Sequence, residues 1–332
     1  MRHQRIGVIG GGAWGTALAQ TLSAAGHDVA LWAREREVVD DINQRHTNQA
    51  FLPGVTLAPT LTATTELAEV ADRNLLLMVA PAQHVRDVGR ALAGLITPGT
   101  PVILCAKGIE QATGKLVVEV LAEALPEAVP AVLSGPSFAA DVARGLPTAV
   151  TLATPDPTTG RALAETLAGR HFRIYWTNDL IGTELGGAIK NVLAIAAGIV
   201  DGRGLGASAH AAMVTRGFAE MRRLGEALGA RSDTLMGLSG LGDLLLTCGS
   251  PQSRNMSLGR ALGQGQSLAN VLGSRRSVAE GVFTASAVVQ LADRHKIEMP
   301  IVAAVDGIVN GRLTIDQAIT ALLSRPLRAE GT

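Results

Sequence analysis

A glycine-rich turn near the start of the chain constrains the fold more than any other feature. Residues 6–9 form a short apolar run, and Gly10, Gly12 and Gly15 follow it in the pattern Gly-x-Gly-x-x-Gly. In a strand-turn-helix unit these glycines allow a tight turn, close approach of the backbone to a pyrophosphate, and close packing of helix on strand. An Ala- and Leu-rich segment and a second apolar run at residues 29–32 complete a βαβ unit. The sequence therefore predicts a dinucleotide site at this turn.

The same N-terminal region also has the outline of a secretory signal peptide, because Arg2 and Arg5 precede the apolar run. The glycines argue against that alternative, since each costs about 1 kcal/mol relative to alanine in a helix interior. We therefore expect no targeting segment and a cytoplasmic protein.

Length and charge narrow the remaining possibilities. A chain of 332 residues exceeds what one core usually supports, which favours two domains. Its 29 Lys and Arg balance its 29 Asp and Glu, so no basic face is expected for nucleic acid. Cys105 and Cys248 lie far apart and fit reduced thiols, without a metal site or a disulfide. Residues 185–200 are nearly uncharged but contain Lys190, and we expect a buried core helix too short to span a bilayer.

The order of apolar patterns predicts the fold class. Further short runs typical of buried parallel strands lie at residues 75–79, 101–106, 131–133, 147–154 and 172–176. Helices are expected within 35–70 and over 83–95, 217–229 and 284–293, and near residues 301 and 316. From residue 179 onward the pattern is helical almost throughout. We predict an α/β protein: a Rossmann-like, doubly wound dinucleotide-binding domain over 1–180, then an all-α substrate-binding domain over 181–332.

The end of the second predicted strand bears on cofactor choice. An NAD-preferring site usually carries an acidic residue there for the ribose 2′-hydroxyl, but this chain has Ala33 and Arg34. A guanidinium at this position suits a 2′-phosphate, so NADP is favoured over NAD. Glu35 weakens the inference, and a solvated surface arginine is the alternative for Arg34.

Two loops follow predicted strands at the sheet edge where ligands of open α/β sheets bind. Lys107 comes directly after the run at 101–106, and Gly135 and Ser137 come after the run that begins at residue 131. An ammonium, backbone groups and a hydroxyl are therefore expected to meet at one edge.

The helical part carries polar residues in apolar surroundings. Lys190 and Asn191 lie in a predicted core helix, and burying an unpaired ammonium costs several kcal/mol. Asp243, an acid in a similar apolar run, is the natural partner, and Thr247 follows on the same helix face at i+4. These four residues are candidates for a functional site, and the family resemblance given below makes them the predicted catalytic set.

Two further segments are candidates for ligand contact. Ser253, Arg254 and Asn255 group a hydroxyl, a guanidinium and an amide, which suits a phosphate. Residues 278–281 (Val-Ala-Glu-Gly) are expected in a turn before the helix at 284–293.

These segments together resemble the bacterial NAD(P)-dependent glycerol-3-phosphate dehydrogenase family over nearly the whole chain. The matching blocks are residues 10–18, 31–34, 105–108, 134–139, 184–192, 240–243, 253–255 and 278–281. The resemblance implies that Lys190 is the proton donor and acceptor. It implies a substrate site made by Lys107, Gly135, Ser137, Lys190, Asp243, Ser253, Arg254 and Asn255. With the glycine motif, it implies cofactor contacts from Gly10, Gly12, Ala13, Trp14, Gly15, Arg34, Lys107, Ala139, Arg254, Val278 and Glu280.

The resemblance also implies an activity: reversible NAD(P)H-dependent reduction of dihydroxyacetone phosphate to sn-glycerol 3-phosphate, supplying glycerophospholipid synthesis, in a homodimer. Ala13 stands where many relatives have serine, and Asp141 where glutamate is usual. Residues 248–250 read Cys-Gly-Ser where Cys-Thr-Ser is common. None of these departures removes a side chain assigned to chemistry.

Two other functions fit parts of the sequence. A module that binds NADPH and signals without turnover would explain Arg34 and Lys107, but it leaves the polar residues of the helical part without a task. A reductase of another 2-oxo or hydroxy acid would use Arg254 for a carboxylate in place of a phosphate.

Overall fold

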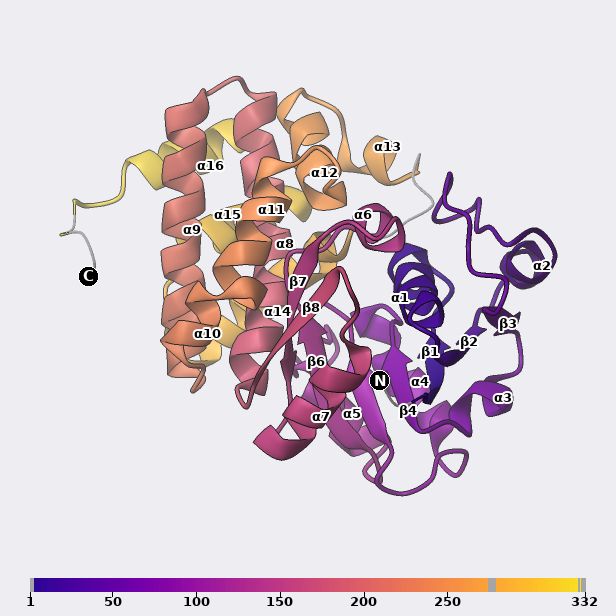
Figure 1. The fold of residues 1–332 in the computed structure, drawn as a ribbon. Coiled ribbons are helices and arrows are strands. Elements are labelled where there is room, and N and C mark those ends of the chain that lie inside the picture. The colour runs from indigo at the N-terminus through magenta and orange to yellow at the C-terminus, as the bar shows by residue number, and fades with distance from the viewer. Residues whose placement is uncertain (1–2, 274–278, 328, 330–332) are drawn as a thin grey trace.

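A computed structural model describes residues 3–273, 279–327 and 329. An eight-stranded sheet organises the first part of the chain (Figure 1), in the order β3-β2-β1-β4-β5-β6-β7-β8. The strands are β1 (Arg5–Ile9), β2 (Asp28–Trp32), β3 (Thr62–Thr64), β4 (Leu75–Met78), β5 (Pro101–Leu104), β6 (Val129–Ser134), β7 (Thr148–Ala153) and β8 (Phe172–Thr177). The short edge strand β3 was not foreseen from the sequence.

The topology places one edge of the sheet for ligand binding. The chain starts at β1, adds β2 and β3 on one side, and then adds β4, β5 and β6 on the other. These six strands are parallel, so their carboxyl ends share one edge, and the direction of winding reverses between β1 and β4. This doubly wound arrangement confirms the predicted fold class, and its reversal point is where such sheets bind ligands.

The strand β7 departs from the expected parallel pattern. It pairs antiparallel to β6, with Leu133 opposite Leu152, whereas β8 is parallel to β7. The β6–β7 connection contains only the five-residue helix α6 (Ala139–Ala143). A parallel return needs a crossover of a dozen or more residues, usually with a full helix. The eleven-residue helix α7 (Pro157–Leu167) provides that crossover between β7 and β8.

Both faces of the central strands are buried, which explains their uninterrupted apolar sequences. Leu75 and Leu77 belong to one hydrophobic core, while Leu76 and Met78 belong to the core on the opposite face. Side chains alternate between faces along a strand, so only a sheet covered on both sides requires such a run. The remaining elements of this part are α1 (Ala13–Ala24), α2 (Arg36–Arg45), α3 (Leu67–Ala71), η1 (Ala82–His84), α4 (Val85–Leu92) and α5 (Val117–Ala124).

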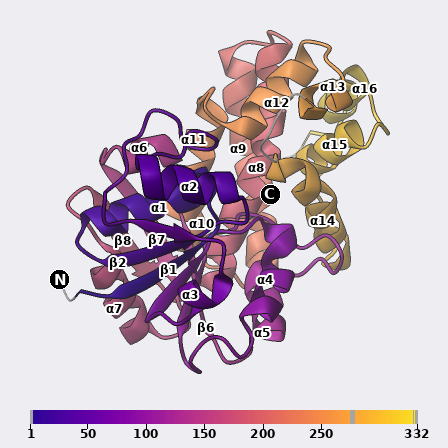
Figure 2. The same ribbon diagram turned by 90° about the vertical axis from the view of Figure 1, so that its right-hand side faces the viewer.

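A second, helical part follows β8, and Figure 2 shows it beside the sheet. Its helices are α8 (Leu180–Gly202), α9 (Ala207–Ala227), α10 (Ser232–Met236), the π-helical turn η2 (Leu238–Gly242), α11 (Asp243–Gly249), α12 (Arg254–Gly263), α13 (Leu268–Gly273), α14 (Glu280–Arg294), α15 (Pro300–Val309) and α16 (Ile315–Leu323). We call residues 5–177 the sheet half and residues 180–323 the helical half. The helix α8 packs against β6 and β7 on one side and against α9, α11, α12, α14 and α15 on the other. It therefore joins the two halves.

Several predicted boundaries in the helical half are wrong. The helix α9 begins ten residues before the expected start, and α14 begins at Glu280, so Glu280 and Gly281 lie in its first turn and not before it. Val278 lies outside the described residues.

The helix α8 is also longer than expected. With 23 residues, it is the one helix among the described residues that could cross a membrane by length and composition, and 83% of its most apolar stretch is buried inside the molecule. The prediction that it is too short is wrong, whereas the prediction of a core helix agrees with its burial.

Candidate active site

The glycine turn leaves open space at the start of α1. Gly10 adopts φ 126°, and a Cβ on Gly15 would lie 1.9 Å from the Gly10 carbonyl oxygen, so α1 lies directly against the turn. A Cβ on Gly12 would meet nothing within 4 Å. Gly12 is the N-cap of α1 and provides no side-chain cap for the free N–H groups of the first turn. A helix N-terminus of this kind binds an anion such as a pyrophosphate.

Two predicted cofactor residues flank this turn. Trp14 lies in the first turn of α1, after Ala13, and its buried indole N–H has no partner among the described residues. Arg34 follows β2, keeps 80% of its side chain exposed, and pairs with Glu35 at 2.9 Å. The guanidinium is therefore open to solvent and to a ligand.

Four polar side chains meet where the helical half approaches the carboxyl edge of the sheet. The Lys190 ammonium donates to Asp243 Oδ1 at 2.6 Å and to Thr247 Oγ1 at 2.9 Å. The Lys107 ammonium donates to Asp243 Oδ2 at 2.7 Å and to the Gly135 carbonyl at 3.1 Å. One carboxylate that is 1% exposed therefore holds two ammonium groups. The structure brings Lys190, Asp243 and Thr247 of the predicted catalytic set together with Lys107, a predicted substrate contact.

Burial sets the protonation of this cluster. The pKa of Lys190 is lowered to about 8, chiefly by burial and also by the neighbouring Lys107 charge, while the Asp243 carboxylate acts in the opposite direction. Desolvation disfavours a charged form and an opposite charge favours it. Lys190 is thus poised to exchange a proton near neutral pH.

Close contact between α8 and η2 places Asp243 beside Lys190. A Cβ on Gly186 of α8 would lie only 2.4 Å from the Ser239 carbonyl oxygen of η2. Asp243 follows η2 as the first residue of α11, with Thr247 one turn later. The glycine therefore allows the approach that brings a carboxylate 53 residues away in sequence to the ammonium.

The loop after β6 faces the same cluster. Gly135 has φ 146°, and its carbonyl oxygen accepts hydrogen bonds from Lys107 and, at 3.0 Å, from the Ser137 hydroxyl. Ala139 begins α6 directly afterwards. The predicted substrate residues Gly135 and Ser137 thus lie beside the Lys107 ammonium.

The N-terminus of α12 carries the predicted phosphate group of residues. Ser253 is its N-cap and accepts from the Met256 N–H at 3.2 Å, and Arg254 is its first residue. Asn255 donates to Asn191 Oδ1 at 2.9 Å. Burial raises the pKa of Glu280, the first residue of α14. The Arg254 charge acts in the opposite direction and lowers that pKa.

Comparison with known proteins identifies the family. The model of the NAD-dependent glycerol-3-phosphate dehydrogenase N-terminus matches residues 5–160, and the model of its C-terminus matches residues 179–320. This chain belongs to that family. It is 60% identical to the glycerol-3-phosphate dehydrogenase [NAD(P)+] of Parvibaculum lavamentivorans, over 99% of each chain. The crystal structure of glycerol-3-phosphate dehydrogenase from Coxiella burnetii superimposes with a TM-score of 0.93 at 40% identity, covering 97% of this chain and 99% of that one.

In this member of the glycerol-3-phosphate dehydrogenase family, some contacts of the site could not be predicted from the sequence. The Glu280 carboxylate accepts a hydrogen bond from the backbone N–H of Ala82, which joins α14 to the start of η1. The buried hydroxyls of Ser134 and Thr284 have no partner among the described residues. A contact made by a backbone N–H does not depend on the residue type, so no sequence pattern indicates it. A single serine or threonine likewise does not indicate a site, because these residues are common.

Two buried acids of the family member lie outside the cluster and bind the N-termini of neighbouring helices. Glu184 accepts from the Val118 N–H of α5 at 2.8 Å, and burial raises its pKa to about 8. Glu220 accepts from the N–H groups of Ile301 and Val302 at the start of α15, and burial raises its pKa to about 7. Both therefore serve helix N-termini.

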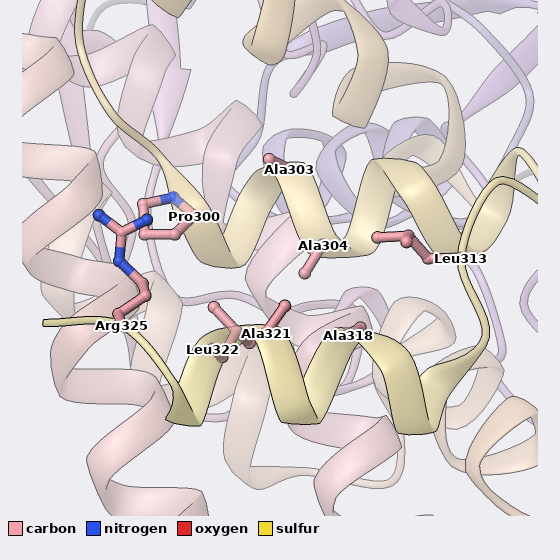
Figure 3. A pocket seen from close by; sticks show the side chains of 8 residues that line it. All are labelled: Pro300, Ala303, Ala304, Leu313, Ala318, Ala321, Leu322 and Arg325. Carbon is pink, nitrogen blue, oxygen red and sulfur yellow. The ribbon is translucent and has the colours of Figure 1, made fainter.

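An apolar hollow of about 240 Å³ lies between α15 and α16. Figure 3 shows its lining residues, Pro300, Ala303, Ala304, Leu313, Ala318, Ala321, Leu322 and Arg325. Its single charged residue, Arg325, pairs with Glu298 at 2.8 Å, and none of the predicted site residues lines it. Among the described residues, no group of three or more His, Cys, Asp or Glu side chains could hold a metal ion.

Proposed function

We propose that this chain catalyses the reversible NAD(P)H-dependent reduction of dihydroxyacetone phosphate to sn-glycerol 3-phosphate. The observation that carries the proposal is the buried Lys190 ammonium, held by Asp243 and Thr247 next to Lys107 at the carboxyl edge of the sheet. The names of relatives that are 52–60% identical support the same activity. A purely cofactor-sensing module leaves this buried cluster without a task.

The sheet half fits a dinucleotide cofactor. The open space at Gly12, the uncapped start of α1 and the unpartnered Trp14 indole N–H are the observations that support this fit. When bound there, the nicotinamide group supplies the hydride. The residues proposed to hold the cofactor are Gly10, Gly12, Ala13, Trp14, Gly15, Arg34, Lys107, Ala139, Arg254 and Glu280. Val278, the remaining predicted contact, lies outside the described residues.

Lys190 is proposed as the general acid and base. In the reductive direction its ammonium polarises the substrate carbonyl and gives a proton to the oxygen that becomes the C2 hydroxyl. Asp243 and Thr247 orient the ammonium, and the Asp243 carboxylate balances the charge. In the oxidative direction neutral Lys190 takes the hydroxyl proton. A pKa near 8 allows both directions near neutral pH.

The substrate phosphate is proposed to bind at the start of α12. Arg254 supplies a planar guanidinium, and the N-terminus of the ten-residue helix adds a partial positive charge. Ser253 and Asn255 flank it, and Lys107, Gly135 and Ser137 line the side toward the sheet. Because the phosphate is remote from the reacting carbon, its binding energy fixes the carbonyl for reaction.

Four further points are part of the proposal. The exposed Arg34 guanidinium supports a preference for NADP over NAD. A homodimer, a cytoplasmic location without a membrane span, and a role in supplying glycerophospholipid synthesis follow from the family resemblance. Light scattering in solution tests the dimer, because a monomeric mass contradicts it.

A direct assay tests the function. We expect NADPH absorbance to fall when dihydroxyacetone phosphate is added to the purified protein, and not when dihydroxyacetone or a phosphate-free 2-oxo acid is added. Binding of NADPH without turnover on any of these compounds would favour the sensing module. Turnover on the 2-oxo acid alone would favour the other class of reductase, with Arg254 bound to a carboxylate.

A further inference from the structure

A row of hydrogen bonds through two asparagines joins four segments that are distant in sequence. Asn191 Nδ2 of α8 donates to the Lys107 carbonyl oxygen at 3.0 Å. Asn255 Nδ2 of α12 donates to Asn191 Oδ1 at 2.9 Å. The Gly281 N–H of α14 donates to Asn255 Oδ1 at 3.1 Å. Both asparagines are 7% exposed. We call these four residues the asparagine row.

The two ends of the row fix its direction. The Lys107 carbonyl can only accept a hydrogen bond, and the Gly281 N–H can only donate one. Asn191 must therefore direct its NH2 group toward Lys107, and Asn255 must direct its oxygen toward Gly281. The remaining NH2 group of Asn255 then faces the remaining oxygen of Asn191, so every bond in the row has a donor and an acceptor.

Every member of the row is, or adjoins, a proposed ligand contact. Lys107 itself is proposed to contact both ligands, and Asn191 follows the proposed acid and base. Asn255 follows Arg254, the proposed phosphate ligand, and Gly281 follows Glu280, a proposed cofactor contact. The row thus connects the backbones that carry the substrate contacts to the backbones that carry the cofactor contacts.

The segments joined by the asparagine row are closely packed. A Cβ on Gly281 would lie 2.5 Å from the Asn191 carbonyl oxygen and 2.9 Å from Asn255 Oδ1. Asn191 Nδ2 also reaches the Gly187 carbonyl at 3.4 Å, so its amide is engaged on every side by the protein. A shift of the start of α12 therefore strains its hydrogen bonds to α8 and α14.

We infer that Asn191 and Asn255 are positioning residues through which the substrate phosphate and the dinucleotide influence each other's binding. This inference rests on the proposed function. Asn191 was grouped with the catalytic residues in the sequence, but its amide is taken up by the protein and supports its neighbours. A phosphate that fixes Arg254 and the start of α12 also fixes Glu280 and Lys107, so the second ligand meets contacts already in place.

Equilibrium binding tests the inference without turnover. NADPH and sn-glycerol 3-phosphate are both reduced and cannot react together, so the Kd of NADPH can be measured by its fluorescence with and without saturating sn-glycerol 3-phosphate. We expect the wild-type Kd to fall about fivefold or more, the lower end of usual coupling between sites. We expect Asn255→Asp, which loses the donor to Asn191, to bring this ratio close to one. Asn255→Ser is the milder second variant if Asn255→Asp unfolds.

Asn43→Asp is the matched control. Asn43 also makes two backbone hydrogen bonds, with Ala63 N–H and carbonyl, both at 2.8 Å, but it lies in the sheet half away from the row. We expect it to keep the wild-type ratio. A wild-type ratio of one, or an Asn255 variant that binds each ligand more weakly with the ratio unchanged, overturns the inference. Failure of the proposed function is distinct, because wild-type protein would then neither bind sn-glycerol 3-phosphate nor turn over dihydroxyacetone phosphate.

Discussion

Glycine residues have different structural roles in the sheet half and in the helical half. In the sheet half, Gly12 faces open space, since an added Cβ meets no atom within 4 Å. In the helical half, a Cβ on Gly198 of α8 would lie 2.0 Å from the Met256 carbonyl, and one on Gly259 of α12 would lie 2.0 Å from the Ile195 carbonyl. The first glycine leaves room for a ligand, whereas the other two let two helices lie almost backbone to backbone.

This difference explains how polar groups reach the site in each half. The sheet half offers backbone N–H groups at a strand-to-helix turn, which is a local arrangement. The helical half needs side chains from several helices, and the close contact of α8 with α12 lets the short Asn255 side chain reach Asn191. Interaxial distance depends on the side chains at the contact, so a larger residue there would separate the helices.

The largest expected effect is the loss of activity when the buried Lys190 ammonium of the helical half is removed. Lys190→Met should lower kcat by about 10²–10⁴, the usual contribution of a general acid or base, and leave NADPH affinity unchanged. Steady-state kinetics and NADPH fluorescence measure the two quantities. The exposed Lys115→Met, which removes a lysine paired with Glu123 on the surface, is the control. If Lys190→Met retained a tenth of wild-type turnover, Lys190 would not be the acid.

The pH dependence of the wild type sharpens this prediction. Burial lowers the pKa of Lys190 to about 8. Reduction needs the protonated form, so its kcat/KM should hold below pH 8 and fall above it. Oxidation needs the neutral form, so its kcat/KM should rise through the same pH range. Profiles that move in the same direction would contradict the assignment.

The next effect concerns packing in the helical half. Gly259→Ala places a methyl group against the Ile195 carbonyl, and overpacking of this kind costs about 1–3 kcal/mol, although alanine is the better helix former. Urea denaturation measures the loss in free energy of unfolding. Gly249→Ala is the control, because it is also helical but its Cβ would meet nothing within 4 Å. Equal stability of the two variants would remove the distinction drawn between the halves.

The sheet half and the helical half also differ in how much of their structure could be predicted from the sequence. The glycine turn, the central strands and the strand-end position of Lys107 could be predicted because each depends on consecutive residues. The pairing of Lys190 with Asp243 could be predicted because a buried ammonium needs a carboxylate. The reversed strand β7, the start of α14 at Glu280 and the two amide contacts of Asn255 could not, since they depend on connection lengths and on helices that meet only in the folded chain.

Gly12→Ala tests the sheet half in the opposite sense. The backbone there is extended, with φ −72°, and the space is open, so the free energy of unfolding should change by less than about 1 kcal/mol. A methyl group should nevertheless hinder the approach of a pyrophosphate and raise the Kd of NADPH at least tenfold, about 1.4 kcal/mol. Fluorescence titration and urea denaturation give the two values. Unchanged NADPH binding would mean that the cofactor does not approach Gly12.

The smallest expected effect is at Arg34, where the sheet half contributes a side chain and not backbone. The guanidinium is 80% exposed and pairs with Glu35, so replacing it should leave stability unchanged, as for most surface ion pairs. Solvent also limits its attraction to a 2′-phosphate. Arg34→Ala should therefore raise the KM for NADPH about three- to tenfold, or roughly 0.7–1.4 kcal/mol, with little change in the KM for NADH.

Two neighbouring variants show whether that effect is specific. Arg36→Ala removes an arginine that is 78% exposed and paired with Asp40 within α2, so it removes the same charge from the nearby surface. It should leave both KM values unchanged. Glu35→Gln removes the ion pair of Arg34 and should lower the KM for NADPH. The guanidinium then no longer has to give up its bond to the Glu35 carboxylate in order to bind the 2′-phosphate. If Arg34→Ala instead raised both KM values equally, Arg34 would contact a part common to the two cofactors, and the preference for NADP would lose its basis.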